Sequence, residues 1–302
     1  MDERIKLGVV GAGVFGGYHT GKVANHPGAQ LVGIYDPDKA RREANAGKFD
    51  CKPYERLERL IADVDGLVIA CPAIYHAGAA LPAIKAGRHV LIEKPIAASA
   101  EDGQAIVDAA LVNNVIVQIG HQERFVMKAI GIDQAPERPT LIRARRMGPY
   151  SARGTDVSVT LDLMTHDLDM VIWMMGGSPL NITGQSLAVQ SATPDAAQAV
   201  LYFEGGGKAY LEASRVEQGR DRIMEVHYPS GVLRIDFVNK TFEDTTGFGF
   251  NPNFGDDPSA ADSLGAGTDA FITAIKTNTL PPVTGRDGLA SLKAALEIDG
   301  VN

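Results

Sequence analysis

The chain has 302 residues, 45% of them hydrophobic and 22% charged, so it can bury one large core or two ordinary ones, which excludes a disordered tail and a small disulfide-held protein. Its 37 acidic and 29 basic residues give a formal net charge of −8, which argues against nucleic acid as a general partner. The two cysteines, Cys51 and Cys71, form neither a disulfide framework nor a Cys-x-x-Cys pair, so we expect a reducing compartment, the cytoplasm.

The N-terminal residues carry charge, and the apolar run after them is interrupted by glycines, so we expect no signal peptide. The most apolar longer stretch, 66–84, is interrupted by Pro72, His76 and Pro82. We therefore expect it to form a buried strand, a loop and a helix, and we expect no membrane-spanning segment.

Short β-rich runs alternate with helical patterns up to residue 120. The expected strands are 5–10, 31–35, 67–70, 89–92 and 115–118, and the expected helices are 14–24, 38–46, 54–62, 77–86 and 101–111. This alternation predicts an α/β domain over 1–120, a doubly wound parallel sheet of the Rossmann type with right-handed crossovers.

The pattern changes after residue 120. We expect strands at 141–147, 182–190, 197–203, 208–214, 223–228 and 232–238, helices at 160–175, 268–277 and 287–297, and a long loop at 246–267. Consecutive strands with short turns predict a second, α+β domain over 121–302 with a largely antiparallel open sheet, whose final helices are able to pack back on the first domain.

A glycine-rich loop joins the first expected strand to the first expected helix. It reads Gly11-Ala-Gly13-Val14-Phe15-Gly16, the Gly-x-Gly-x-x-Gly spacing that lets a pyrophosphate approach the backbone at a positive helix end. A tight strand-to-helix turn without a ligand is the alternative. The position between strand and helix favours a dinucleotide site.

An acidic residue supports this interpretation. Asp36 ends the second expected strand, 20 residues after Gly16, where a carboxylate accepts hydrogen bonds from the adenosine ribose. A carboxylate repels a 2′-phosphate, so we expect NAD rather than NADP. The nearby Arg41 and Arg42 keep NADP open.

A lysine follows the fourth expected strand, in Glu93-Lys94-Pro95. Ligands of doubly wound sheets bind at the carboxyl ends of strands, so Lys94 is a candidate for chemistry. Its ammonium could stabilise an alkoxide, or pass a proton where burial lowers its pKa. The alternative is a lysine that buries its stem and keeps its amine in water.

Polar residues interrupt the apolar helix 160–175. At about 100° per residue, Asp162, His166 and Asp169 fall within roughly a 60° arc, and Asp167 lies off it. A histidine there is a candidate general base, oriented by aspartates. The alternatives are a satisfied buried histidine or a metal site. We expect no metal, because no other His or Cys cluster supplies a fourth ligand.

Taken in order, the glycine loop, Glu93-Lys94-Pro95 and the helix from Asp162 to Asp169 resemble the glucose-fructose oxidoreductase, inositol dehydrogenase and MocA (Gfo/Idh/MocA) family over nearly the whole chain. Cys71-Pro72-x-x-x-His76, followed by an Ala-rich helix and Gly87-Arg-His-Val90, is similar to the nicotinamide side of that family.

The resemblance implies a role for each matching residue. Lys94 would be the catalytic lysine, His166 the general acid or base, and Asp162 the carboxylate that binds substrate or supports the histidine. Gly11, Gly13, Val14, Phe15, Gly16 and Asp36 would hold the adenine half of the cofactor, and Cys71, Pro72, His76 and Glu93 would line the nicotinamide side. Cys71 stands where the family often has Thr or Asn, and we interpret it as a small buried residue.

One branch of the family, which oxidises the 3-hydroxyl of UDP-N-acetylglucosamine, is similar to this chain at 120–125, 146–149 and 153–156, although Val126-Met127 replaces its usual Asn-Pro. Arg124, Arg146 and Arg153 would then bind substrate. Arg143, Arg145, Arg146 and Arg153 form a local basic cluster that suits a diphosphate. Strand alternation puts only some arginines of 143–153 on one face, so pairing with surface acids is the alternative.

The sequence therefore predicts an enzyme, an NAD(P)-dependent dehydrogenase that moves hydride between the hydroxyl carbon of a sugar or sugar nucleotide and nicotinamide. Its central requirement is that the Lys94 amine and the His166 imidazole meet beside the nicotinamide. A non-catalytic dinucleotide-binding regulator, an NAD-dependent glycoside hydrolase and, last, a metal-dependent hydrolase are the alternatives. We expect a homodimer or homotetramer, because the open sheet offers a face to another copy.

Overall fold

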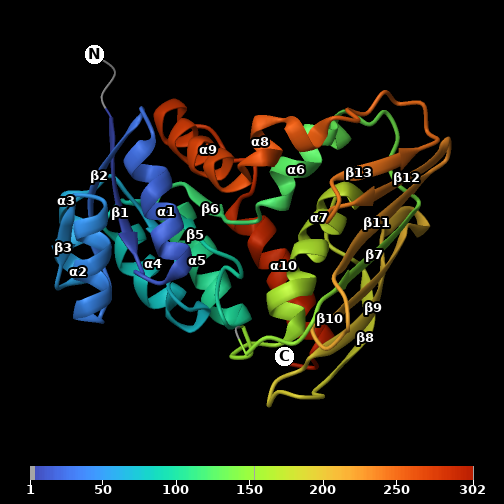
Figure 1. Ribbon diagram of the computed structural model, residues 1–302, viewed down its shortest axis with the longest axis horizontal. Coiled ribbons are helices and arrows are strands. Elements are labelled where there is room, and N and C mark those ends of the chain that lie inside the picture. The colour runs from blue at the N-terminus through green and yellow to red at the C-terminus, as the bar shows by residue number, and fades with distance from the viewer. Residues whose placement is uncertain (1–3, 153, 302) are drawn as a thin grey trace. The chain divides into compact units, whose positions relative to one another are not determined.

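The computed structural model describes residues 4–152 and 154–301 (Figure 1). These residues form two compact units. The first unit consists of residues 4–122 and 262–289, and the second of 123–261 and 290–301. Part of the C-terminal region expected within 121–302 thus belongs to the first unit.

A six-stranded sheet with all strands parallel forms the centre of the first unit. Its strands are β1 (Ile5–Val10), β2 (Ala29–Tyr35), β3 (Lys52–Tyr54), β4 (Gly66–Ile69), β5 (His89–Ile92) and β6 (Val117–Ile119), in the order β3-β2-β1-β4-β5-β6. The strand order reverses between β1 and β4, as in a doubly wound sheet. The expected Rossmann-type fold is confirmed, and the short strand β3 is an addition to it.

Helices cover this sheet. They are α1 (Val14–Asn25), α2 (Lys39–Lys48), α3 (Leu57–Asp63), α4 (His76–Lys85), α5 (Ala100–Asn113) and α9 (Ser263–Thr277). Side chains cap several of them: Asp38 accepts from Arg41 N at 3.1 Å, and Ser99 from Asp102 N at 3.1 Å. From α9, Phe271 enters the core beside Leu7, so the chain returns to the first unit to complete its core.

The second unit is built on a seven-stranded sheet. Its strands are β7 (Leu141–Met147), β8 (Asn181–Leu187), β9 (Ala196–Tyr202), β10 (Lys208–Ser214), β11 (Asp221–Tyr228), β12 (Gly231–Asp236) and β13 (Thr241–Asp244), in the order β13-β12-β11-β7-β10-β9-β8. Only β7 and β10 pair in parallel. The expected antiparallel open sheet is confirmed, with β13 as an additional edge strand.

Alternation along β7 separates the two faces of this sheet. Ile142, Ala144 and Arg146 are buried, whereas Arg143 and Arg145 are exposed. The buried face packs against α7 (Thr165–Met175), as Figure 1 shows. The other helices of this unit are α6 (Glu123–Ile130) and α8 (Pro258–Ala261), and α10 (Gly285–Ile298) passes from the first unit into the second.

Two expectations in this region are corrected. The helix expected at 160–175 begins as a π-helical turn, Thr160–Met164, in which Thr165 N donates to the Thr160 carbonyl. Contacts with the chain end accompany this turn, because Ser158 and Thr160 both donate to the Asp299 carboxylate, at 2.5 and 2.7 Å. The loop expected at 246–267 contains α8 and the start of α9, which its glycine- and acid-rich composition concealed.

Candidate active site

The carboxyl ends of five strands lie side by side in the first unit. Pairing places the last residues of the strands, Val10, Tyr35, Ile69, Ile92 and Ile119, in register. The residues that follow them, including Gly11, Asp36, Cys71 and Lys94, therefore share one edge of the sheet. Residues that are more than 80 positions apart in the sequence meet there, as the doubly wound topology requires.

The glycine loop needs glycine for two different reasons. Gly11 has a φ of +100°, and a Cβ on it would lie 2.8 Å from the Ala70 backbone. A Cβ on Gly16 would lie 1.9 Å from the Gly11 carbonyl oxygen, so the loop closes directly on the start of α1. At Gly13 a Cβ would meet no described atom within 4 Å, and Val14 is 58% exposed. This open backbone at a helix start fits a pyrophosphate.

Asp36 is held against this loop. Its carboxylate accepts from Ala12 N at 2.7 Å and from Asp38 N at 2.8 Å. Arg42 is buried and donates to the Asp36 carbonyl at 2.7 Å, and Arg41 lies on Asp38 at 3.3 Å. The guanidinium of Arg42 thus donates to a backbone carbonyl, and the Asp36 carboxylate is the charged group in contact with the glycine loop. A carboxylate there favours a ribose with a free 2′-hydroxyl over one with a 2′-phosphate.

Lys94 follows β5 and is partly exposed. Its neighbour Glu93 is buried and hydrogen-bonded to His19 of α1, with 2.7 Å between Oε1 and Nε2. Burial raises the pKa of Glu93, but the hydrogen bond and the charge of His19 lower it by a larger amount. The net pKa therefore lies below its usual value. Glu93 therefore joins α1 to the end of β5 from inside the unit.

His76 and Cys71 lie on the same edge. His76 is 1% exposed, and its ring nitrogens lie 2.8 Å from the Pro95 carbonyl and 2.9 Å from the Cys71 carbonyl. Burial lowers the pKa of His76, although the two carbonyls act in the opposite direction, and burial raises the pKa of Cys71 to about 11. Pro72, between them, is exposed. His76 thus lies between the chain segments that follow β4 and β5.

In the second unit, His166 lies on α7 beside a carboxylate from α6. Its Nδ1 is 2.6 Å from Glu123 Oε2, and the two side chains are 17% and 18% exposed. Burial raises the pKa of Glu123, but the charges of His166 and Arg146 outweigh this and hold it well below its usual value. Glu123 is therefore ionised and lies in ion-pair contact with the Nδ1 side of the imidazole.

Two arginines expected to bind substrate are instead buried partners of α7. Arg124 donates to Asp169 at 2.7 and 2.9 Å, with its guanidinium 4.8 Å from the Trp173 ring centre. Arg146 donates to Asp167 at 2.9 and 2.9 Å and lies 3.2 Å from Glu123. Each arginine is 3% exposed. This placement differs from the expected diphosphate contact, and it fixes the face that α7 presents.

The third such arginine, Arg153, lies outside the described residues. Asp162 lies in the π-helical turn and is partly exposed. Its carboxylate is next to Gly154, where a Cβ would lie 2.7 Å from Oδ2 and where φ is +81°. The stripe expected for Asp162, His166 and Asp169 is seen in part: His166 and Asp169 contact α6, whereas Asp162 faces the loop before the helix.

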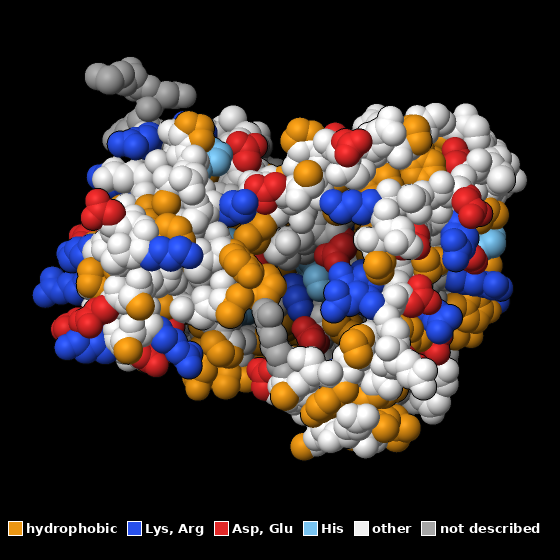
Figure 2. Space-filling model, in the orientation of Figure 1, with side chains coloured by type: hydrophobic (Ala, Val, Ile, Leu, Met, Phe, Trp, Pro, Cys, Tyr) orange, Lys and Arg blue, Asp and Glu red, His pale blue; other side chains and the backbone are white. Residues whose placement is uncertain are grey.

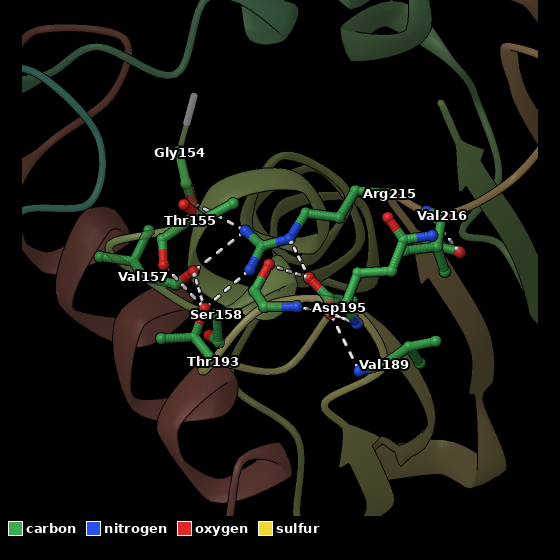
Figure 3. Close-up of polar contacts among 12 residues, drawn as sticks. Gly154, Thr155, Val157, Ser158, Val189, Thr193, Asp195, Arg215 and Val216 are labelled. Atoms are coloured by element: carbon green, nitrogen blue, oxygen red, sulfur yellow. Dashed lines mark hydrogen bonds and ion pairs between the residues drawn. The ribbon is translucent and has the colours of Figure 1, made fainter. Parts of the chain in front are cut away.

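A buried ion pair holds that loop (Figure 3). Arg215 donates to the Gly154 carbonyl at 2.7 Å, to the Val157 carbonyl at 3.0 Å and to Asp195 at 2.8 Å. Asp195 is fully buried and also accepts from Ser191 N at 2.7 Å. Burial raises the pKa of Asp195, but these hydrogen bonds outweigh it and lower the pKa below its usual range. The ion pair therefore places the loop that contacts Asp162.

Sequence reasoning missed Glu123, Asp167 and the Asp195–Arg215 pair as parts of the site. Glu123 lies inside the Gly-His-Gln-Glu-Arg-Phe motif at 120–125, so the motif itself was the available signal. Asp167 was set aside because it lies off the expected stripe, yet it faces β7. Asp195 and Arg215 are 20 residues apart, on neighbouring strand ends, and no spacing rule connects them.

No group of three or more His, Cys, Asp or Glu side chains among the described residues is arranged to hold a metal ion. No helix in residues 4–152 or 154–301 is both long and apolar enough to cross a lipid bilayer.

Two family models match the chain. Residues 5–121 match the oxidoreductase family with an NAD-binding Rossmann fold, and residues 138–234 match the GFO/IDH/MocA C-terminal domain. The two matches fall on the two sheets described above, and the first includes the glycine loop and Lys94.

Similar proteins cover nearly the full length. The UDP-N-acetylglucosamine 3-dehydrogenase of Acidithiobacillus ferrooxidans is 30% identical over 97% of this chain and 96% of its own, and a solved structure of it, GnnA, aligns with a TM-score of 0.90 over 98% and 96%. The inositol 2-dehydrogenase of Rhizobium meliloti is 26% identical over 96% and 94%. This chain therefore belongs to the Gfo/Idh/MocA family of NAD-binding oxidoreductases.

Proposed function

We propose that the protein is an NAD-dependent dehydrogenase that oxidises the 3-hydroxyl of UDP-N-acetylglucosamine or of a closely similar sugar nucleotide. The observation that carries this proposal is the partly exposed His166, held at Nδ1 by the ionised Glu123. A full-length relative with this activity supports the substrate class. The inositol dehydrogenase relatives make a free cyclic polyol the competing substrate.

The first unit fits the cofactor. The open backbone at Gly13 suits the pyrophosphate, Gly11, Val14, Phe15 and Gly16 form the rest of that loop, and Asp36 would accept from the ribose. When bound, NAD supplies the hydride acceptor for alcohol oxidation. Cys71, Pro72, His76 and Glu93 would border the nicotinamide, His76 and Glu93 by fixing the backbone of the strand ends.

His166 is the proposed general base. Its Nε2 would take the proton of the sugar hydroxyl, and the imidazolium that forms would lie beside the Glu123 carboxylate, whose Oε2 is 2.6 Å from Nδ1. General acid–base contacts of this kind contribute roughly two to four powers of ten in rate. Asp162, held next to Gly154, would bind the sugar and position the reacting hydroxyl.

Lys94 is the proposed electrostatic partner. Its ammonium would stabilise the negative charge that develops on the hydroxyl oxygen as the proton leaves, and it would bind the carbonyl oxygen of the ketone product. This role requires the Lys94 amine and the His166 imidazole to act on the same oxygen, which remains the central requirement of the proposal.

An absorbance assay for reduced nicotinamide tests the proposal. The purified protein is incubated with NAD or NADP and with UDP-N-acetylglucosamine, UDP-glucose, free N-acetylglucosamine or myo-inositol. We expect reduction with NAD and UDP-N-acetylglucosamine, accompanied by the 3-keto product. Reduction with inositol alone would move the substrate to a free polyol. Release of UDP or free sugar without net reduction would support an NAD-dependent hydrolase, and cofactor binding without any reaction would support a regulator.

We also propose a cytoplasmic homo-oligomer. Both cysteines are free thiols, which suits a reducing compartment. The sheet face opposite α7 carries exposed side chains, among them Tyr210 at 44% exposure, and offers a surface to a second copy. Light scattering during gel filtration tests the oligomer, and a Tyr210→Arg variant that elutes like the wild type would remove this face from consideration.

A further inference from the structure

Arg222 on β11 stands next to the His166 region of the second unit. It is the register partner of Arg146 on the neighbouring strand β7, so the two side chains leave the same face of the sheet. Arg146 contacts Asp167 of α7 and Glu123, which contacts His166. Arg222 therefore lies one strand away from the charged groups that hold the proposed general base.

Arg222 differs from the other arginines on this face. Among residues 4–152 and 154–301, no carboxylate lies within 4.0 Å of the guanidinium nitrogens of Arg222 or of Arg220, two residues earlier. Arg222 is half-buried and Arg220 is exposed. Burial and the charge of Arg146 lower the pKa of Arg222, with a further contribution from Arg220. Three arginines, Arg146, Arg220 and Arg222, thus lie near two carboxylates, those of Glu123 and Asp167, and positive charge is in excess.

The opposite face of the same strands shows the contrast. Arg145 lies 3.5 Å from Asp221 and 3.9 Å from Glu212, and Arg234 lies 3.4 Å from Glu225. Surface arginines there are balanced by acids of neighbouring strands. An arginine without a neighbouring acid, such as Arg222, is thus found on the face that packs against α7 and contrasts with the paired arginines of the opposite face. Figure 2 shows basic and acidic side chains gathered with a histidine over the region of α7.

We propose that Arg222, assisted by Arg220, is the anion subsite that binds the diphosphate of a nucleoside diphosphate sugar. A guanidinium presents planar paired donors that match phosphate oxygens, and two guanidiniums two residues apart suit two linked phosphates. The subsite rests on the proposed function and deepens it, because it selects sugar nucleotides over free sugars. It takes the diphosphate role expected from the sequence for the basic cluster that includes Arg146, whose donors are directed at a carboxylate.

The test compares Arg222→Gln with the wild type and with a matched control, Arg145→Gln, on the opposite face of the adjacent strand. We expect Arg222→Gln to weaken UDP binding, measured by calorimetry, about ten- to a hundredfold, since hydrogen bonds to charged groups have about this worth. The KM for UDP-N-acetylglucosamine should rise similarly, with kcat and NAD affinity nearly unchanged. Arg145→Gln should behave like the wild type.

The exposed Arg220→Gln variant guards against a folding defect, and we expect it to weaken UDP binding about threefold or more. Equal UDP affinity in wild type, Arg222→Gln and Arg220→Gln would overturn the subsite, as would no UDP binding by the wild type. Displacement of UDP by glucuronate at equal affinity would also overturn it, by making the ligand a sugar carboxylate. If UDP binds through Arg222 but no sugar nucleotide reduces NAD, the proposed function fails and the subsite stands.

Discussion

The two units hold their candidate residues in place by different means. In the first unit, close backbone contacts at Gly11 and Gly16 shape the loop between β1 and α1, and the nearby thiol of Cys71 is neutral. In the second unit, the face of α7 is held by charges, Glu123, Arg146 and Arg124 among them. The comparison indicates that steric fit decides the conformation of the glycine loop in the first unit. In the second unit, removal of one charged side chain leaves its buried partner unpaired.

The largest effect should come from the residues proposed to act in the reaction. Lys94→Met and His166→Asn, one from each region, should each lower kcat by about a hundred- to ten-thousand-fold, because each removes a group that we propose to act on the hydroxyl oxygen. NAD affinity, measured by fluorescence titration, should stay near that of the wild type. Full turnover in either variant would break the assignment of chemistry to both units.

Asp169→Ala should have the largest effect on stability. It leaves the buried Arg124 guanidinium without its bidentate partner, and breaking such a buried pair costs about 3 to 5 kcal/mol. Urea unfolding monitored by circular dichroism gives the free energy. Asp162→Ala, on the same helical segment but partly exposed, is the control and should lose far less. Equal losses would contradict the view that buried charges fix α7.

Glu123→Gln tests whether the carboxylate acts through His166. We expect kcat to fall about ten- to a hundredfold with little change in KM, as found for supporting carboxylates of histidines. Because the folded-state pKa of Glu123 is depressed, its stabilising contribution is present at neutral pH and is lost as pH falls below about 4. The stability difference between wild type and variant should therefore shrink on acidification. A constant difference from pH 7 to pH 3 would reject this assignment.

Gly11→Ala tests the importance of shape in the first unit. The added Cβ would lie 2.8 Å from the Ala70 backbone at a φ of +100°, so the loop must shift. We expect NAD affinity to fall about tenfold, in line with backbone strain of about 1 to 3 kcal/mol. Gly47→Ala, in α2 with no atom near its Cβ, is the control. Unchanged affinity in Gly11→Ala would show that the loop does not bind the cofactor.

Cys71→Ala should have the smallest effect, less than about threefold on kcat/KM. With a pKa of about 11, the thiol is protonated at neutral pH, so the thiolate fraction at pH 8 is about a hundredfold lower than for an ordinary thiol. Alkylation by iodoacetamide, followed by mass spectrometry, should be correspondingly slow and should accelerate as pH rises toward 11. Rapid alkylation at pH 7 would show that the Cys71 thiol is ionised there, against the neutral side chain described above.

Local patterns were sufficient for most of the fold. β1, β5, β7 and β10 begin and end where the apolar and alternating runs predict, because strand pattern depends on neighbouring residues. The short strands β3 and β13 were not predicted from the sequence, because three or four residues show little periodicity. The π-helical turn at Thr160–Met164 also escaped, because its contacts come from the remote Asp299.

The sequence alone determined the glycine loop, its acidic partner Asp36 and the positions of Lys94 and His166, because motif spacing and strand ends are local properties. Only the tertiary structure decided what surrounds them. Arg124 and Asp169 are 45 residues apart, and Arg146 and Asp167 are 21 apart, yet each pair closes into a buried ion pair. Burial makes an unpaired charge costly, so the packing of α6, α7 and β7 selects which charges pair and which remain available to a ligand.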